Sequence, residues 1–191
     1  MKHNLYKMMG LDIYLSSLSK SEYKAVSAEI SNTSRVMTPL MSWDVYSQGY
    51  IDTLNESERL QDIAKVKSYA KQLNWKNTMD SIFENEAFQA IIITDLNQNI
   101  VWVNKGFSKM TGYAKNEVLH KTPKMLQGVE TSVSARRNIK KKIALNTPFK
   151  ENITNYKKSG EPYECEVKIF PLYSTEDNNK THFIALERKV G

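Results

Sequence analysis

Hydrophobic residues in the first part of the chain recur at helical spacing. A capping-box pattern at Ser19 predicts the start of one helix. An apolar-rich segment over 43–54 predicts a second, although Gly49 weakens its continuity. A third is expected to start after Asn55, a favourable N-cap residue. Its apolar stripe consists of Leu60, Ile63, Val66, Ala70 and Leu73. We therefore expect residues 1–78 to form about three helices that pack on one another and on the following domain, or form an oligomer interface.

The pattern changes over residues 79–191, where short β-branched or alternating segments are separated by turn residues. A short helix is expected at 79–85, further helical pieces at 106–119, and a longer basic helix at 132–146. The predicted strands span residues 90–94, 100–104, 149–156, 163–173 and 181–189. Two strands, several helices and three more strands predict an α+β fold in which helices cover one face of a five-stranded antiparallel sheet.

Composition narrows the class of protein. Hydrophobic residues make up 40% and charged residues 25% of the 191 positions, as in ordinary globular proteins. The longest apolar run, 90–93, is far too short to span a membrane. The single cysteine, Cys165, has no partner for an internal disulfide and belongs to no metal-ligand cluster. We expect a cytoplasmic protein with no metal site and no membrane segment.

Much of the net charge of +6 lies in one basic stretch between residues 121 and 142. Its cations, opposed only by Glu130, are Lys121, Lys124, Arg136, Arg137, Lys140, Lys141 and Lys142. Such a surface attracts the phosphate of a mononucleotide, a nucleic acid or a membrane. Charged runs on helices are most often solvated faces, however, and no helix-turn-helix or row of stacking aromatics accompanies this one. Nucleic acid is therefore a disfavoured partner.

No common catalytic motif is present. The chain lacks a Gly-rich phosphate loop, a His-Glu-x-x-His pair and a nucleophile elbow. We therefore predict that the protein is not an enzyme. No kinase, cyclase or response domain fits beside the predicted elements, so we expect a stand-alone module without an output domain.

Four stretches resemble PAS domains: AIIITDLNQNIVWVNKGFSKMTGY, PKMLQGVETS, NITNYKKSGEPYECEVKIFPLY and HFIALERKV. They follow one another in the order and spacing of that family within residues 79–191. The resemblance implies a PAS fold, whose sheet and flanking helices enclose a pocket for a cofactor or small ligand. Within this fold, Asn104 is expected to cap the helix after the second strand, and Gly112 to end it.

Two of these blocks, LQGVET and NYKKSG, are similar to the LOV subfamily, whose PAS domains bind flavin. In LOV domains a cysteine attacks the excited flavin ring and forms a reversible adduct. Its segment is similar to residues 122–127 here, and Pro123 stands at the cysteine's position. Because proline has no thiol, the resemblance implies a LOV-like domain without adduct chemistry.

The resemblance also implies a set of pocket positions. They are Thr122, Lys124, Gln127, Lys140, Asn155, Cys165 and Glu187. Gln127 and Asn155 match polar residues that contact the flavin in the family. Lys124 and Lys140 replace two arginines that hold the flavin phosphate, which preserves the charge but loses the bidentate fork of arginine.

Two further positions depart from the LOV pattern. Cys165 replaces a ring-contacting asparagine and is predicted to face the pocket, although a free cysteine is more often a small buried core residue. Glu187 replaces a glutamine on the last strand whose amide flips when the flavin changes state. A carboxylate accepts hydrogen bonds but cannot exchange donor for acceptor as an amide does.

These inferences leave two principal functions open. The first is a PAS sensory or protein-interaction module whose partner is another signalling protein or a second copy, bound through the N-terminal helices or the sheet face. A small-molecule ligand is compatible with it. The second is a flavin mononucleotide (FMN) sensor of blue light or redox state that signals without a cysteinyl adduct. Binding of nucleic acid or phospholipid through the basic stretch is a third, weaker interpretation.

Overall fold

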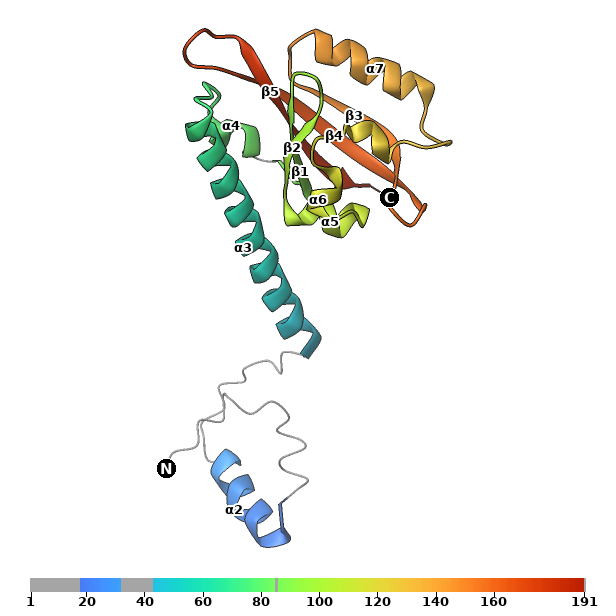
Figure 1. Ribbon diagram of the computed structural model, residues 1–191. Coiled ribbons are helices and arrows are strands. Elements are labelled where there is room, and N and C mark those ends of the chain that lie inside the picture. The colour runs from blue at the N-terminus through green and yellow to red at the C-terminus, as the bar shows by residue number, and fades with distance from the viewer. Residues whose placement is uncertain (1–17, 32–42, 85, 191) are drawn as a thin grey trace. The chain divides into compact units, whose positions relative to one another are not determined.

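The computed structural model describes residues 18–31, 43–84 and 86–190 (Figure 1). The chain divides into two compact units, residues 1–51 and 52–191. In the first unit, helix α2 (Lys20–Ser31) starts at the predicted capping box. The Ser19 hydroxyl donates to the Glu22 carboxylate at 2.6 Å, and the Ser19 amide donates to the same carboxylate at 3.0 Å. The second unit starts at residue 52 and so includes part of the region 1–78 that was predicted to be helical. The predicted domain boundary between residues 78 and 79 stays a prediction.

Helix α3 (Trp43–Gln72) is continuous where the sequence predicted two helices. The expected N-cap, Asn55, lies within it, so that prediction was wrong. Extending an existing helix adds a hydrogen bond for each residue fixed, whereas starting a new helix requires a second unfavourable nucleation step. A single interior Asn or Gly opposes helix formation by only about 1 kcal/mol or less, which is too little to break the helix.

The second unit is built on a five-stranded antiparallel sheet in the order β2-β1-β5-β4-β3. The strands are β1 (Ala90–Asp95), β2 (Ile100–Val103), β3 (Phe149–Tyr156), β4 (Pro162–Tyr173) and β5 (Lys180–Lys189). The last strand is therefore central, with Glu187 opposite Ala90 on β1 and opposite Val167 on β4. The predicted strands and the α+β class are confirmed.

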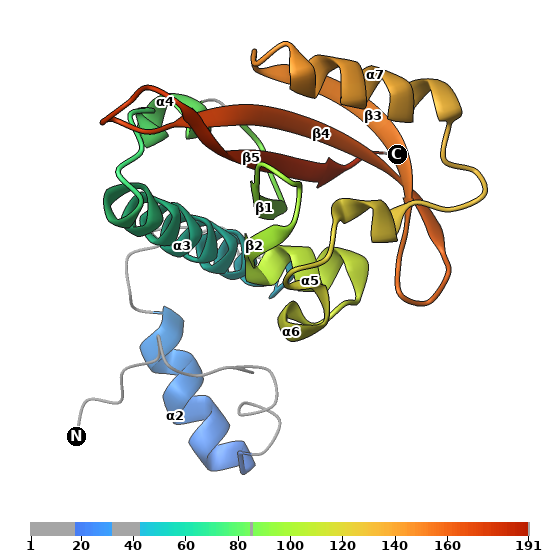
Figure 2. The same ribbon diagram turned by 45° about the horizontal axis from the view of Figure 1, so that its top comes forward.

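Helices cover both faces of this sheet, so the expectation that they cover only one face was wrong. On one face lie α5 (Lys105–Thr111), α6 (Lys115–Val118), the short 3₁₀ helix η2 (Pro123–Leu126) and α7 (Val133–Ala144). On the other face lie α4 (Met79–Phe83) and the second half of α3. Figure 2 shows α3 and α7 separated by the sheet.

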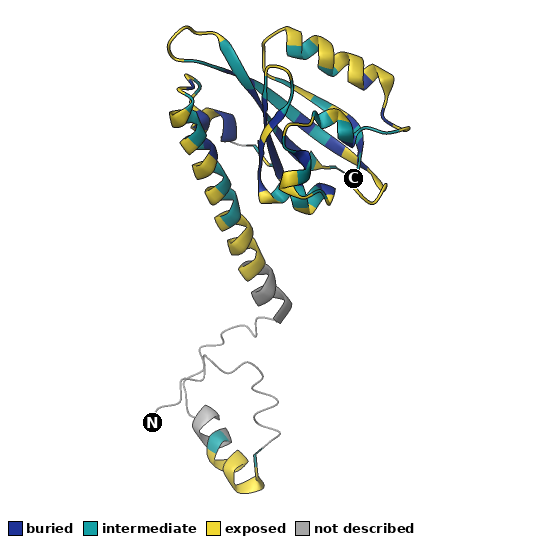
Figure 3. Cartoon of the chain, in the orientation of Figure 1, coloured by how far each residue is buried: buried dark blue, intermediate teal, exposed yellow. Residues whose placement is uncertain are grey.

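Alternation along the strands supplies one core for each face. On β5, Ile184 and Leu186 pack with Val66 and Trp75 of the α3 side. The opposite face packs Ile92, Phe107 and Leu126 together beneath α5 and η2. Figure 3 shows α3 changing from exposed to partly buried toward α4, where the helix covers the sheet. The predicted apolar stripe of α3 thus packs on the following domain over its second half.

Asn104 joins the two helical layers. Its Oδ1 accepts hydrogen bonds from the amides of Phe107 and Ile91, both at 2.9 Å, so it caps α5 as predicted. Its Nδ2 donates to Asp62 on α3 at 2.7 Å. Gly112 ends α5 with a φ of +78°, a conformation that glycine adopts without strain. Across the described stretches, no helix is both long and apolar enough to cross a membrane.

Candidate functional site

A cavity of about 480 Å³ lies between the sheet and the helices α7 and η2. Its volume is in the range of small-ligand sites. The sheet supplies its floor and α7 one wall. The apolar residues that line it are Ile92, Leu126, Val133, Ile139, Ile143, Ile153, Val167, Ile169, Phe183 and Ala185, together with Pro123. These walls favour a flat or apolar molecule over a hydrated ion.

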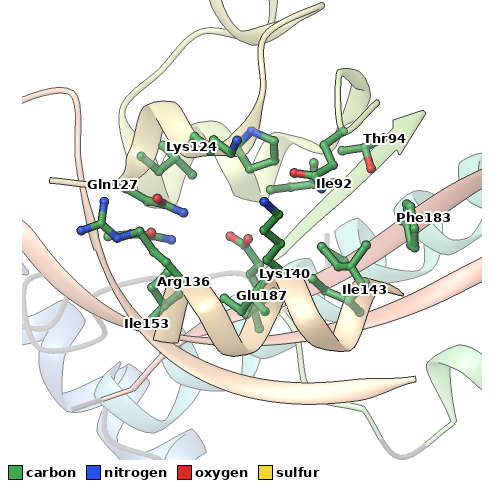
Figure 4. A pocket seen from close by; sticks show the side chains of 18 of the residues that line it. Ile92, Thr94, Lys124, Gln127, Arg136, Lys140, Ile143, Ile153, Phe183 and Glu187 are labelled. Carbon is green, nitrogen blue, oxygen red and sulfur yellow. The ribbon is translucent and has the colours of Figure 1, made fainter. Parts of the chain in front are cut away.

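Exposed cations surround the cavity on the solvent side. We call this set the cationic rim, and it consists of Lys124, Arg136, Arg137 and Lys140. Figure 4 shows Lys124 opposite the two α7 residues Arg136 and Lys140. Within the described part of the chain none of the rim residues forms an ion pair, whereas their neighbour Lys142 pairs with Glu151 at 2.7 Å. The rim is therefore available to an anionic group.

Three amide side chains, those of Gln98, Gln127 and Asn155, add hydrogen-bonding capacity to the cavity. Asn155 on β3 is 5% exposed, and Gln127 follows η2 directly. The next residue, Gly128, has no room for a side chain, because a Cβ there would lie 2.4 Å from the Tyr156 ring. This close packing fixes the loop that carries Gln127. Amides offer both donors and acceptors, so they suit the polar edge of a heterocycle.

Glu187 is a buried acid in the cavity floor. Its side chain comes from the central strand β5, is 4% exposed and points into the cavity (Figure 4). Its Oε2 has no hydrogen-bond partner among the described residues. Burial raises the pKa of this carboxyl to about 7, and a hydrogen bond with Cys165 only partly opposes that rise. The acid is therefore substantially protonated at neutral pH.

Two of the predicted site residues do not line the cavity. Thr122 precedes η2, where its carbonyl oxygen accepts from the Met125 amide at 3.1 Å. Cys165 is fully buried on β4, where it packs with Ile153, Tyr163 and Val167. Burial, and secondly the charge of Glu187, raise the pKa of its thiol far above neutral. The alternative interpretation of Cys165 as a buried core residue therefore agrees with its position.

The other predicted residues meet at one place. Lys124, Gln127, Lys140, Asn155 and Glu187 all line the cavity. The sequence interpretation of the basic stretch as a solvated face missed Arg136 and Arg137 as lining residues. The available signal was their spacing, because residues three and four before Lys140 share its side of the helix. These side chains are exposed and also border the cavity.

Comparisons with known proteins place this geometry in context. The sequence profile described as "PAS domain" matches residues 89–188. Protein TWIN LOV 1 of Arabidopsis thaliana is 32% identical over 88 residues, which are 46% of this chain and 22% of that protein. A blue-light photoreceptor of Listeria innocua serovar 6a is 32% identical over 103 residues, or 52% of this chain and 40% of that protein. The matched segments are thus less than half of either relative.

A solved structure shows the same arrangement of strands and helices. It is the light state of the blue-light photoreceptor Aureochrome1 LOV, with 26% sequence identity and a TM-score of 0.53. The match covers 55% of this chain and 84% of that one.

Proposed function

The chain belongs to the PAS family, and from that premise we propose that its cavity binds FMN and that the domain senses blue light or redox state without a cysteinyl adduct. A PAS domain is a sensory module and is not itself catalytic. One observation carries the proposal: a single cavity combines apolar walls, amide side chains and a cationic rim that forms no ion pair with other described residues. The matched relatives include blue-light photoreceptors and LOV domains, which also supports it.

The residues present fit FMN. The apolar walls would pack against the ring, and Gln127 and Asn155 would bond its polar edge. The cationic rim would attract the phosphate through lysine charge and arginine hydrogen bonds. When bound, the flavin supplies blue-light absorption and reversible redox chemistry. The unpartnered Oε2 of Glu187 leaves one more polar atom in the floor to meet the ligand.

The residues around the cavity support a mechanism without a covalent bond to sulfur. Pro123, at the position of the LOV cysteine, lines the cavity and brings no nucleophile. Cys165 is buried outside the lining, and its raised pKa keeps it as an unreactive thiol near neutral pH. Signalling would then depend on hydrogen bonds and charge around the ring.

Strand β5 gives the cavity a direct mechanical connection to α3. Ala185 and Glu187 line the cavity, and the alternate residues Ile184 and Leu186 pack beneath α3 on the other face. A shift of this strand would therefore change side-chain packing on both faces of the sheet, because side chains on one strand move together.

Ion pairs provide a second connection, between α3 and helix α5 on the cavity face of the sheet. Glu58 pairs with Lys105 at 3.0 Å and with Lys109 at 2.6 Å, both on α5. On its solvent side α3 exposes Leu54 and Leu60, which are 47% and 56% exposed. We infer that α3 passes the state of the cavity to a partner, either another signalling protein or a second copy of this chain.

A flavin titration tests the proposed ligand. FMN and riboflavin, which lacks the phosphate, are added to the purified protein, and binding is followed by flavin fluorescence anisotropy. FMN is expected to bind more tightly, because only FMN carries the anion that the rim attracts. Absence of binding for both flavins would rule out the proposed function.

A further inference from the structure

The Glu187 carboxyl group is an unusual feature for the floor of an apolar cavity. It is 4% exposed on the central strand, and its Oε2 has no partner among the described residues. An unpaired buried polar oxygen costs about 1–3 kcal/mol, so such atoms are rare unless a ligand or water meets them. The carboxyl group points into the space that a ligand would fill (Figure 4).

The groups that face Glu187 do not supply a compensating charge. From β4, the Cys165 thiol contacts the carboxyl, and Tyr163 lies nearby, where burial and secondly the Glu187 charge raise the pKa of its phenol. Both groups are neutral near pH 7. Cys165 also points to the Glu166 carbonyl oxygen, 3.7 Å from its sulfur, and one S–H can serve only one acceptor at a time.

The remaining neighbours come from the other walls. Asn155 on β3 and Gln127 after η2 are uncharged, and the charged residues of η2 and α7 that line the cavity are those of the cationic rim. These cations are exposed, where water screens their effect on a group in the floor. Nothing in the lining therefore holds Glu187 in its ionised form.

Building on the proposed FMN site, we propose that Glu187 binds the ligand as a neutral acid, donating its proton in a hydrogen bond to an acceptor atom on the ring edge. An oxidised flavin ring presents carbonyl oxygens and imine nitrogens as acceptors. An ionised carboxylate has no proton to donate and would place its charge against these electron-rich atoms. The cavity thus selects a heteroaromatic ligand with an acceptor edge at the floor and an anion at the rim.

This arrangement makes ligand binding depend on pH. Only the protonated acid offers the donor, so FMN affinity falls as Glu187 ionises and binding takes up a proton. With half-ionisation near pH 7, the protonated fraction falls about tenfold between pH 6 and pH 8. A glutamine at this position donates at every pH. The affinity of Glu187→Gln is therefore expected to lack this tenfold loss.

The test compares FMN dissociation constants of the wild-type protein and Glu187→Gln at pH 6 and pH 8. The FMN phosphate also titrates in this range, but it does so equally in both proteins. The ratio of the wild-type to the variant dissociation constant should rise about tenfold from pH 6 to pH 8. Glu84→Gln, at an exposed acid, should behave like the wild type.

The outcomes separate the two proposals. A ratio that stays constant between pH 6 and pH 8 overturns the role of Glu187 and leaves FMN binding intact. No binding by either protein at either pH overturns the FMN site, and the donor role with it. Should the variant fail to fold, calorimetry of the wild-type protein in buffers of different ionisation enthalpy measures the proton uptake directly. Zero uptake near pH 7 would contradict the proposal.

Discussion

At the residue scale, Glu187 links ligand binding to stability. Its pKa is about 7 in the folded protein, against an ordinary value of 4.5. The unfolded chain therefore releases this proton at lower pH than the folded protein does. The Glu187 contribution to stability is lost as pH rises from about 4.5 through 7. The full effect corresponds to about 3 kcal/mol. Above pH 7 the unfolding free energy of the flavin-free protein is lowered by this full amount.

The Glu187→Gln substitution is expected to change the pH dependence of stability in flavin-free protein. The variant should lack the loss between pH 4.5 and 7, and its unfolding free energy should exceed that of the wild type by up to about 3 kcal/mol at pH 8. Urea unfolding across this pH range measures the difference. Glu84→Gln serves as the exposed control. Parallel pH profiles for wild type and Glu187→Gln would show that Glu187 ionises normally.

At the element scale, α7 presents two kinds of cation on one helix. Arg137 and Lys140 line the cavity, whereas the adjacent Lys141 does not. Replacing Arg137 or Lys140 with alanine should weaken FMN binding about tenfold and riboflavin binding little, because a charge-assisted hydrogen bond is worth about 1.5 kcal/mol. Lys141→Ala is the matched control. Equal effects of all three substitutions would mean that the rim acts only through net charge.

Local patterns predicted most elements, and the errors arose where longer-range effects decide. Alternating strands and the Asn104 cap follow from nearby residues, and the structure confirms them. The Asn55 cap was wrong because helix propagation across 43–72 outweighs one local preference. In the site, Arg136 and Arg137 were missed as lining residues because their position depends on how α7 packs over the sheet.

The unpaired state of Glu187 could not be predicted from the sequence either. The resemblance identified its position on the last strand, but the missing partner of Oε2 depends on every wall of the cavity. The same holds for Cys165, which shares the cavity face of the sheet and yet lies outside the lining. Strand periodicity gives the face of a residue and not its depth.

At the scale of the whole molecule, the sheet connects the cavity to α3. FMN binding is expected to slow amide hydrogen exchange in the second half of α3, because β5 carries side chains into both the cavity and the α3 core. Hydrogen–deuterium exchange mass spectrometry with and without FMN measures this change. Protection confined to β5, η2 and α7 would contradict transmission to α3.

The visible absorption spectrum of the purified protein after incubation with FMN and removal of free ligand tests the central claim most directly. Our account predicts a yellow protein that absorbs blue light, because the cavity, the amides and the cationic rim together retain the flavin. A protein that remains colourless after this treatment would contradict it.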